Sequence, residues 1–126
     1  MIRYYPSVID VVAAHDFQIR MFGGATGLRD RGALEAAIYR PQSGYYDDLI
    51  AEAAALWESL SQNHPFVDGN KRTAKVSVYG FLKKNGLRVT ATDADLLAFL
   101  KRLYDGPGLT MDVVDGWLRE NTESVR

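Results

Sequence analysis

The stretch His64-Pro65-Phe66-Val67-Asp68-Gly69-Asn70-Lys71-Arg72-Thr73-Ala74-Lys75 decides how the rest of this chain is interpreted. It places a histidine, a carboxylate, an amide and three cations close together, and an apolar-rich run, 76–82, follows directly. This order predicts a polar loop that leads into the start of a buried helix. The first N–H groups of a helix have no partner within the helix and lie at the positive end of its dipole. The stretch therefore predicts an anion site at a helix start.

Composition indicates a soluble globular protein, which we expect to form one domain over residues 1–126, because 47% of the residues are hydrophobic and 25% are charged. The net charge of -1 argues against a general nucleic-acid binder, so no direct binding to nucleic acid is expected. The absence of cysteine excludes disulfides, thiol catalysis and thiolate metal sites. The first residues show no signal-peptide core and no apolar run is long enough to span a bilayer, so we expect a cytoplasmic protein without membrane contact.

Apolar spacing and capping residues predict an all-α fold of six helical segments. The first segment is expected to open at Pro6 or Ser7 and to end at Gly23-Gly24, and the second to begin with a cap at Asp30 and to stop at Pro41. The third is expected at 49–62, after Asp47-Asp48, and the fourth at about 69–85, with Gly86 after its end. The fifth is expected to follow a cap at Thr92 and to continue to Leu103, and the sixth to begin at Thr110 and to continue to Leu118.

The fourth segment is apolar over most of its circumference, so it is expected to be the buried central helix around which the others pack. Residues 87–90 are compatible with an extended conformation but are too few to predict a sheet. Residues 121–126 are expected to fray.

The positive charge of this region is unevenly placed, because Asp68 is the one acid between His64 and Arg88. Lys71, Arg72 and Lys75 occupy the first two turns of the fourth segment, where the helix dipole disfavours cations. Solvated surface cations are one interpretation. The other, which we favour, is that these residues bind an anion, specifically the phosphates of a nucleotide triphosphate.

Three residues of the stretch have two interpretations each. His64 is either a packed histidine before a proline or a general base that activates a hydroxyl. Asp68 is either the N-cap of the helix or a magnesium ligand, and Asn70 either binds a phosphate or closes the turn. Rival motifs fail, since the chain has no P-loop, no G-x-S-x-G and only two histidines, too few for a zinc site.

The run from His64 to Arg72 resembles the signature of the Fic/Doc family, H-x-F-x-D/E-G-N-G/K-R. Further stretches resemble the Doc branch, namely 15–16, 21–24, 27–30, 71–74 and 81–86. The resemblance implies the small all-α Fic core, in agreement with the predicted helices. His15 and Asp16 are expected to form a structural hydrogen-bonded pair.

The resemblance also implies an activity. Fic enzymes transfer part of a nucleotide, usually AMP, to a protein hydroxyl, whereas Doc is a toxin that phosphorylates a threonine of elongation factor Tu and arrests translation. Both use ATP and magnesium. Carried onto this chain, the resemblance makes His64 the base, Phe66 an anchor of the loop, Asp68 the magnesium ligand, and Gly69, Asn70, Lys71, Arg72 and Lys75 the nucleotide-binding residues.

Lys71 separates the two reactions, because AMP-transferring members usually have glycine there. In the Doc branch, a lysine at this position goes with a nucleotide bound in the opposite orientation, so that the γ-phosphate faces the histidine. This orientation favours kinase chemistry. Gly69 follows the Fic form, and Lys75 stands where Fic proteins have a second arginine. An AMP transferase is therefore the alternative, and a silent antitoxin-binding regulatory module is a second one.

Regulation and target docking are also implied by the resemblance. Self-inhibited Fic proteins carry S/T-x-x-x-E-G/N, but here Gly116 lies four residues before Glu120-Asn121. The motif is absent, so a Phd-like antitoxin is expected to act in trans. The segment 43–46 is either a flap that docks the target or an ordinary loop whose tyrosines pack on the core.

Overall fold

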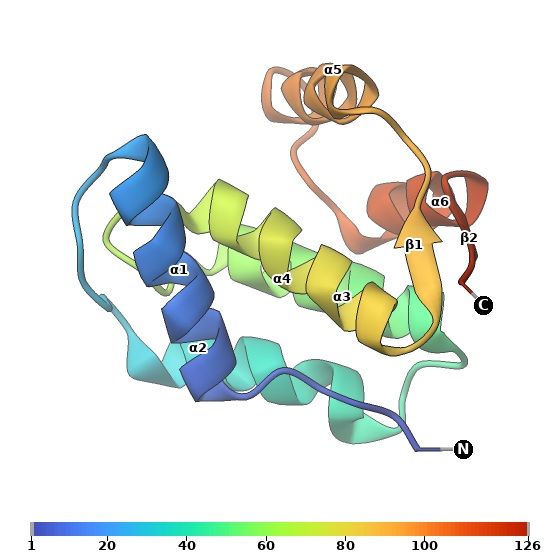
Figure 1. Cartoon of the computed structure of the whole chain (residues 1–126), viewed down its shortest axis with the longest axis horizontal. Helices are drawn as coiled ribbons and strands as arrows, with labels where there is room; N and C mark the ends of the chain where they lie inside the picture. The colour runs from blue at the N-terminus through green and yellow to red at the C-terminus, as the bar shows by residue number, and fades with distance from the viewer. Residues whose placement is uncertain (1, 126) are drawn as a thin grey trace.

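The computed structural model describes residues 2–125, and within them the chain is mostly helical (Figure 1). In chain order the elements are α1 (Val8–Phe22), α2 (Arg31–Tyr39), the 3₁₀ helix η1 (Arg40–Ser43), α3 (Leu49–Gln62), α4 (Asn70–Lys84), β1 (Leu87–Val89), α5 (Asp93–Tyr104), α6 (Met111–Glu120) and β2 (Thr122–Ser124). The predicted all-α class is confirmed. None of the described helices is long and apolar enough to cross a bilayer.

Local capping chemistry sets where the helices begin. Ser7 and Asp10 form a capping box at α1, because each side chain accepts a hydrogen bond from the other residue's backbone N–H. Asp30, Asp48 and Thr110 likewise accept from the backbone at the starts of α2, α3 and α6. The sequence predicted all of these starts.

The most enclosed helix is α3 rather than α4, which corrects the expectation of a central fourth helix. Helices α2, α4 and α6 all pack against α3, and its Trp57 is fully buried between the rings of Tyr79 and Trp117. Helix α4 buries one face against α1 and α3 but leaves Lys71 and Arg72 in solvent. The run of alanines in α3 allows this close packing on several sides, since small side chains let neighbouring helices approach.

The C-terminal segment pairs with β1, so the expected fraying of 121–126 is wrong as far as residue 125. Strands β1 and β2 are antiparallel, with Leu87 opposite Ser124 and Val89 opposite Thr122. Val125 N–H also donates to the carbonyl of Gly86 at 2.8 Å. These hydrogen bonds satisfy backbone groups that a frayed end would leave to water. Arg126 lies outside the described residues.

The predicted anion site lies at one end of the α3–α4 pair. The loop that joins these two helices meets the loop between α1 and α2 at the left of Figure 1. The loop between η1 and α3, which contains residues 44–48, lies at the opposite end in the same view.

Candidate functional site

The loop from Asn63 to Gly69 is held in place by the loop that joins α1 to α2. Leu28 and Phe66 form an isolated antiparallel bridge. Val67 N–H donates to the carbonyl of Gly27 at 3.0 Å, and Arg29 N–H donates to that of Pro65 at 2.8 Å. The site is therefore built on two segments that are distant in sequence.

Phe66 anchors this loop in the core, as the family resemblance implied. Its side chain is 2% exposed and stacks on the His15 ring, with the centroids 3.9 Å apart. The side chain of Asn70 closes the turn, because its Oδ1 accepts from Phe66 N–H at 2.9 Å and its Nδ2 donates to Phe66 O at 3.0 Å. Of the two interpretations of Asn70, the geometry assigns the amide to the turn.

Asp68 is exposed and ties the loop to the residues after α1. Its Oδ2 accepts from Ala25 N–H at 3.1 Å, and its Oδ1 accepts from Gly69 N–H at 2.8 Å. These two backbone hydrogen bonds hold the pKa of Asp68 below its ordinary value, and the charge of Arg72 adds to the effect. Asp68 stays ionised at neutral pH.

Of the two interpretations of Asp68, the N-cap of α4 is wrong, because the N-cap residue is Gly69 and no side chain caps this helix. Gly69 has φ 73°, and a Cβ there would lie 3.1 Å from Cδ1 of Ile19. The positive φ favours glycine, and a Cβ at this position would also press on the end of the Ile19 side chain.

His15 contacts Asp68 more closely than Asp16. Its Nε2 lies 2.7 Å from the carbonyl oxygen of Asp68, whereas its Nδ1 is 3.7 Å from the Asp16 carboxylate. The ring is 1% exposed. The structural role expected of His15 is confirmed, but the expected hydrogen bond to Asp16 is wrong, because 3.7 Å is too long for one and the ring pairs instead with the carbonyl of Asp68.

The start of α4 leaves three backbone donors free. Among the hydrogen bonds of residues 2–125, none satisfies the N–H groups of Asn70, Lys71 or Arg72, while the N–H of Thr73 reaches the carbonyl of Gly69 at 3.0 Å. Unsatisfied N–H groups at a helix start form an anion site.

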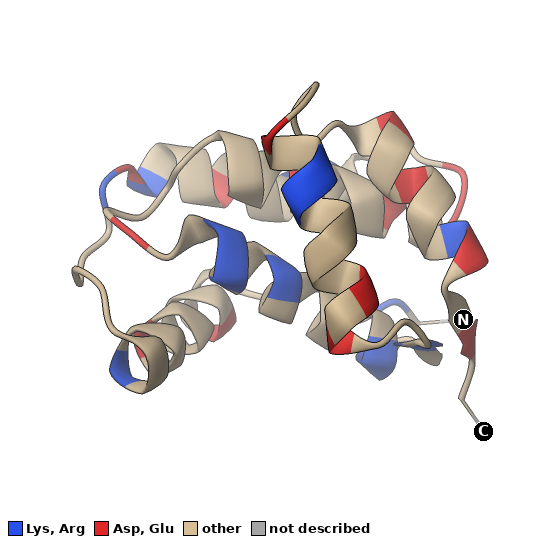
Figure 2. Cartoon of the chain, turned by 90° about the horizontal axis from the view of Figure 1, so that it is seen from above, with Lys and Arg blue, Asp and Glu red and all other residues tan. Residues whose placement is uncertain are grey.

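Three cations surround these donors without a carboxylate partner. Within the described chain, Lys71, Arg72 and Lys75 form no ion pair. Each instead lies over an aromatic ring: Lys71 Nζ is 4.0 Å from the Tyr104 centroid, Arg72 Cζ is 5.0 Å from that of Phe22, and Lys75 Nζ is 5.0 Å from that of Tyr79. Figure 2 shows the basic positions at the start of α4, beside α5. The positive charge is thus available to an anion.

A cleft of about 500 Å³ opens between α4 and α5 beside these cations. Its apolar wall is formed by leucines of α5, and its polar wall contains Lys71, Arg72 and Lys75. The volume lies within the range typical of small-molecule sites.

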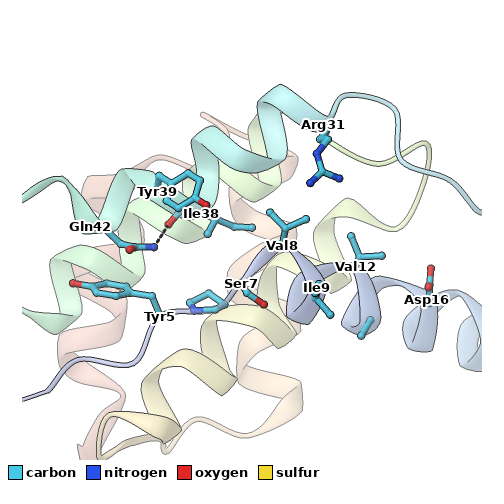
Figure 3. Close-up of a pocket in the computed structure, with 12 residues that line it drawn as sticks. Tyr5, Ser7, Val8, Ile9, Val12, Asp16, Arg31, Ile38, Tyr39 and Gln42 are labelled. Atoms are coloured by element: carbon cyan, nitrogen blue, oxygen red, sulfur yellow. Dashed lines mark hydrogen bonds between the residues drawn. The ribbon is translucent and has the colours of Figure 1, made fainter.

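A larger hollow, of about 860 Å³, lies between α1 and α2 (Figure 3). Tyr5, Val8 and Ile38 contribute to its lining, and none of its lining residues belongs to the stretch 64–75. The candidate site therefore includes the smaller cleft, whose lining contains the three unpaired cations, whereas His64 and Asp68 do not line it.

His64 is exposed, and no hydrogen bond or ion pair of its side chain occurs among the described residues. Its φ is 47°, in the left-handed region. The Arg29 guanidinium donates to its carbonyl oxygen. Sequence reasoning missed the contribution of Arg29, although the glycines at 24 and 27 signalled an unusual loop there.

The segment 43–46 matches the interpretation as an ordinary loop only in part, because Tyr46 is held by Arg40 whereas Tyr45 is 83% exposed and does not pack on the core. Arg40 Nε donates to the hydroxyl of Tyr46 at 2.6 Å, and the loop lies at the other end of α3 from His64 (Figure 1). The position removes the support for a target-docking flap at these residues.

Helical architecture, a H-x-F-x-D-G-N-K-R loop and an open helix start define a Fic-type site. Comparison agrees, since the sequence model of the Fic/DOC family matches residues 5–82. This chain belongs to the Fic/DOC family.

Two relatives place it in the Doc-like branch. It is 47% identical to the Toxin Doc of Mycolicibacterium smegmatis over 75 residues, 56% of this chain and 58% of that toxin. It is 38% identical to the Protein kinase doc of Escherichia phage P1 over 84 residues, 64% of this chain and 67% of that protein. The match thus spans less than two thirds of the mycobacterial toxin.

Proposed function

We propose that this chain is a Doc-like toxin that transfers the γ-phosphate of ATP to a hydroxyl of a translation factor, elongation factor Tu, and so arrests translation in the cytoplasm. One observation carries the proposal. The three free N–H groups at the start of α4 and the unpaired cations around them lie a few residues from an exposed histidine. The name of the phage relative, Protein kinase doc, supports the same chemistry.

His64 takes the proton of the attacking hydroxyl in this proposal. The hydroxyl oxygen bonds to the γ-phosphorus, the bond from that phosphorus to the bridging oxygen breaks, and ADP leaves. The N–H groups of Asn70, Lys71 and Arg72 hold phosphate oxygens, and the Arg72 and Lys75 side chains add positive charge. Gly69 allows the close approach of the backbone.

Asp68 fits the role of a magnesium ligand. Each of its carboxylate oxygens accepts one N–H, which leaves lone pairs directed to solvent, and its lowered pKa keeps it charged. Magnesium is commonly bound through one or two carboxylates together with phosphates and water. When bound, it neutralises developing charge on the phosphates.

Lys71 favours phosphate transfer over AMP transfer. Its side chain extends from the start of α4 to the ring of Tyr104. By the family resemblance, a lysine here takes the place of the glycine that leaves room for a phosphate in AMP-transferring members. The alternative of AMP transfer is supported by Lys75, which is half-buried one turn further along and stands at the position of the second Fic arginine.

Restraint of the toxin requires a second chain in this proposal, because the chain lacks the inhibitory motif S/T-x-x-x-E-G/N. A Phd-like antitoxin is the expected partner. The toxin name of the mycobacterial relative supports such a pair.

Controlled expression in a bacterial host tests the proposal. Induction of the wild-type chain is expected to stop protein synthesis, and His64→Ala is expected to permit growth at equal protein levels. Arg31→Ala is the matched control, since Arg31 is exposed and pairs with Glu35. Arrest that persists in His64→Ala would show that toxicity does not depend on this chemistry.

A further inference from the structure

His64 adopts a backbone conformation that this chain otherwise reserves for glycine. Among the described residues it is the only one other than glycine with positive φ. The ends of α1, η1 and α4 each use glycine there, at Gly23, Gly44 and Gly86. After the end of α3, the residue with positive φ is His64 instead of a glycine. A side chain in this region is strained, so the surrounding structure must hold it.

The side chain of Arg29 supplies that restraint. Its Nε donates to the carbonyl of His64 at 2.7 Å, and its Nη2 donates to that of Asn63 at 3.0 Å. Helix α3 has no basic residue in its own last turn. The guanidinium therefore brings the positive charge that the C-terminal carbonyls of a helix favour, and its planar fork matches two adjacent acceptors.

Backbone and side chain of Arg29 have separable roles. The N–H groups of Arg29 and Asp30 donate to the carbonyl of Pro65 at 2.8 and 3.0 Å, and these bonds do not depend on the side chain. Truncation of the side chain thus leaves the bridge between the two loops intact. It removes only the two hydrogen bonds that hold the carbonyls on either side of the His64 Cα.

We infer that Arg29 is a positioning residue for His64: it holds the left-handed backbone at the end of α3 and so fixes the position from which the imidazole projects. In this inference Arg29 acts through His64 and not by contact with the nucleotide or the target. The inference rests on the proposed function only where it concerns catalysis. The orientation of His64 is a property of the chain alone.

Histidine NMR tests the orientation without any reaction. The chain contains two histidines, so the ring Cε1–Hε1 spectrum has two signals, which His64→Ala assigns. Arg29→Ala is expected to shift or broaden the His64 signal and to leave that of His15 in place. Arg31→Ala should change neither. Free guanidinium, added below denaturing concentrations, is expected to restore the His64 signal in Arg29→Ala, because the vacated position is exposed.

Kinetics provide the second readout. In Arg29→Ala, kcat for transfer is expected to fall on the order of 10- to 100-fold, since a misplaced base loses alignment with the reacting atoms. KM for ATP should stay within about twofold, because no phosphate-binding group changes. If Arg29→Ala does not fold, Arg29→Gln serves in its place, because glutamine also lacks the guanidinium that donates both hydrogen bonds.

Three results would overturn the inference: an unchanged His64 signal, equal movement of both histidine signals, or unaltered kcat in a variant of an active wild type. The absence of transfer by the wild-type chain would contradict the proposed function instead. The NMR result then decides the positioning role by itself.

Discussion

His15 Nε2 lies 2.7 Å from the carbonyl oxygen of Asp68, and this contact joins the middle of α1 to the loop before α4. The same ring stacks on Phe66. One buried side chain therefore fixes both the apolar anchor and the acidic residue of the motif. It follows that the position of Asp68 depends on α1 as much as on its own loop.

Replacement of His15 by leucine keeps most of the buried volume but removes the hydrogen bond. We expect the free energy of unfolding to fall by about 1–3 kcal/mol, the cost of leaving a polar partner unsatisfied. Urea denaturation measures this change, with the exposed Asp16→Ala as control. Stability equal to wild type would show that the contact with Asp68 contributes nothing.

Asn70→Ala should be more damaging, because the amide satisfies both the N–H and the carbonyl of buried Phe66. A loss of about 2–4 kcal/mol in unfolding free energy is expected from two unpaired backbone groups. The matched variant Asn63→Ala, at an exposed asparagine, should be near neutral. If the two variants were equally stable, the turn would not depend on the amide.

The starts of helices were predictable because their causes are local. Ser7, Asp48 and Thr110 each accept a hydrogen bond from the backbone three residues later, and such short-range bonds can be read from the order of residues. The motif likewise predicted where α4 begins and which cations lie beside it.

Contacts between distant segments were not predictable. Three such contacts join residues more than thirty positions apart. They are the pairing of β1 with β2, the hydrogen bond between His15 and Asp68, and the hydrogen bond from Arg29 to the carbonyl of His64. Burial of α3 was also missed, since its many alanines give a weak apolar pattern although they allow neighbours to pack closely.

Acid should destabilise the protein below about pH 4. The pKa of Asp48 is lowered first by hydrogen bonds from Arg119 and then by one from Ala51 N–H. A carboxyl whose pKa is lower in the folded state stabilises fully above its unfolded pKa, about 3.9, and this contribution is lost as the pH falls through the folded value.

Melting temperatures between pH 7 and pH 2 measure this effect. Asp48→Asn should reduce the melting temperature at pH 7 and lessen its decline in acid, whereas Asp47→Asn should follow the wild type. Equal acid profiles for Asp48→Asn and wild type would exclude Asp48 as a source of the pH dependence.

Lys71→Gly tests what determines the transferred group. Loss of this side chain opens space beside the start of α4, so transfer of the γ-phosphate is expected to fall roughly tenfold while AMP transfer appears. ATP labelled at either the γ- or the α-phosphate distinguishes the two reactions. Lys101→Ala removes a charge from the α5 wall of the same cleft and should leave the transferred group unchanged.

The intact mass of elongation factor Tu, after incubation with this chain and magnesium–ATP, tests the central claim most directly. We predict a gain of one phosphoryl group, with the rate reduced on the order of 10²- to 10⁴-fold in His64→Ala. A gain of an adenylyl group, an unchanged mass, or phosphorylation that proceeds equally fast with His64→Ala would contradict the account.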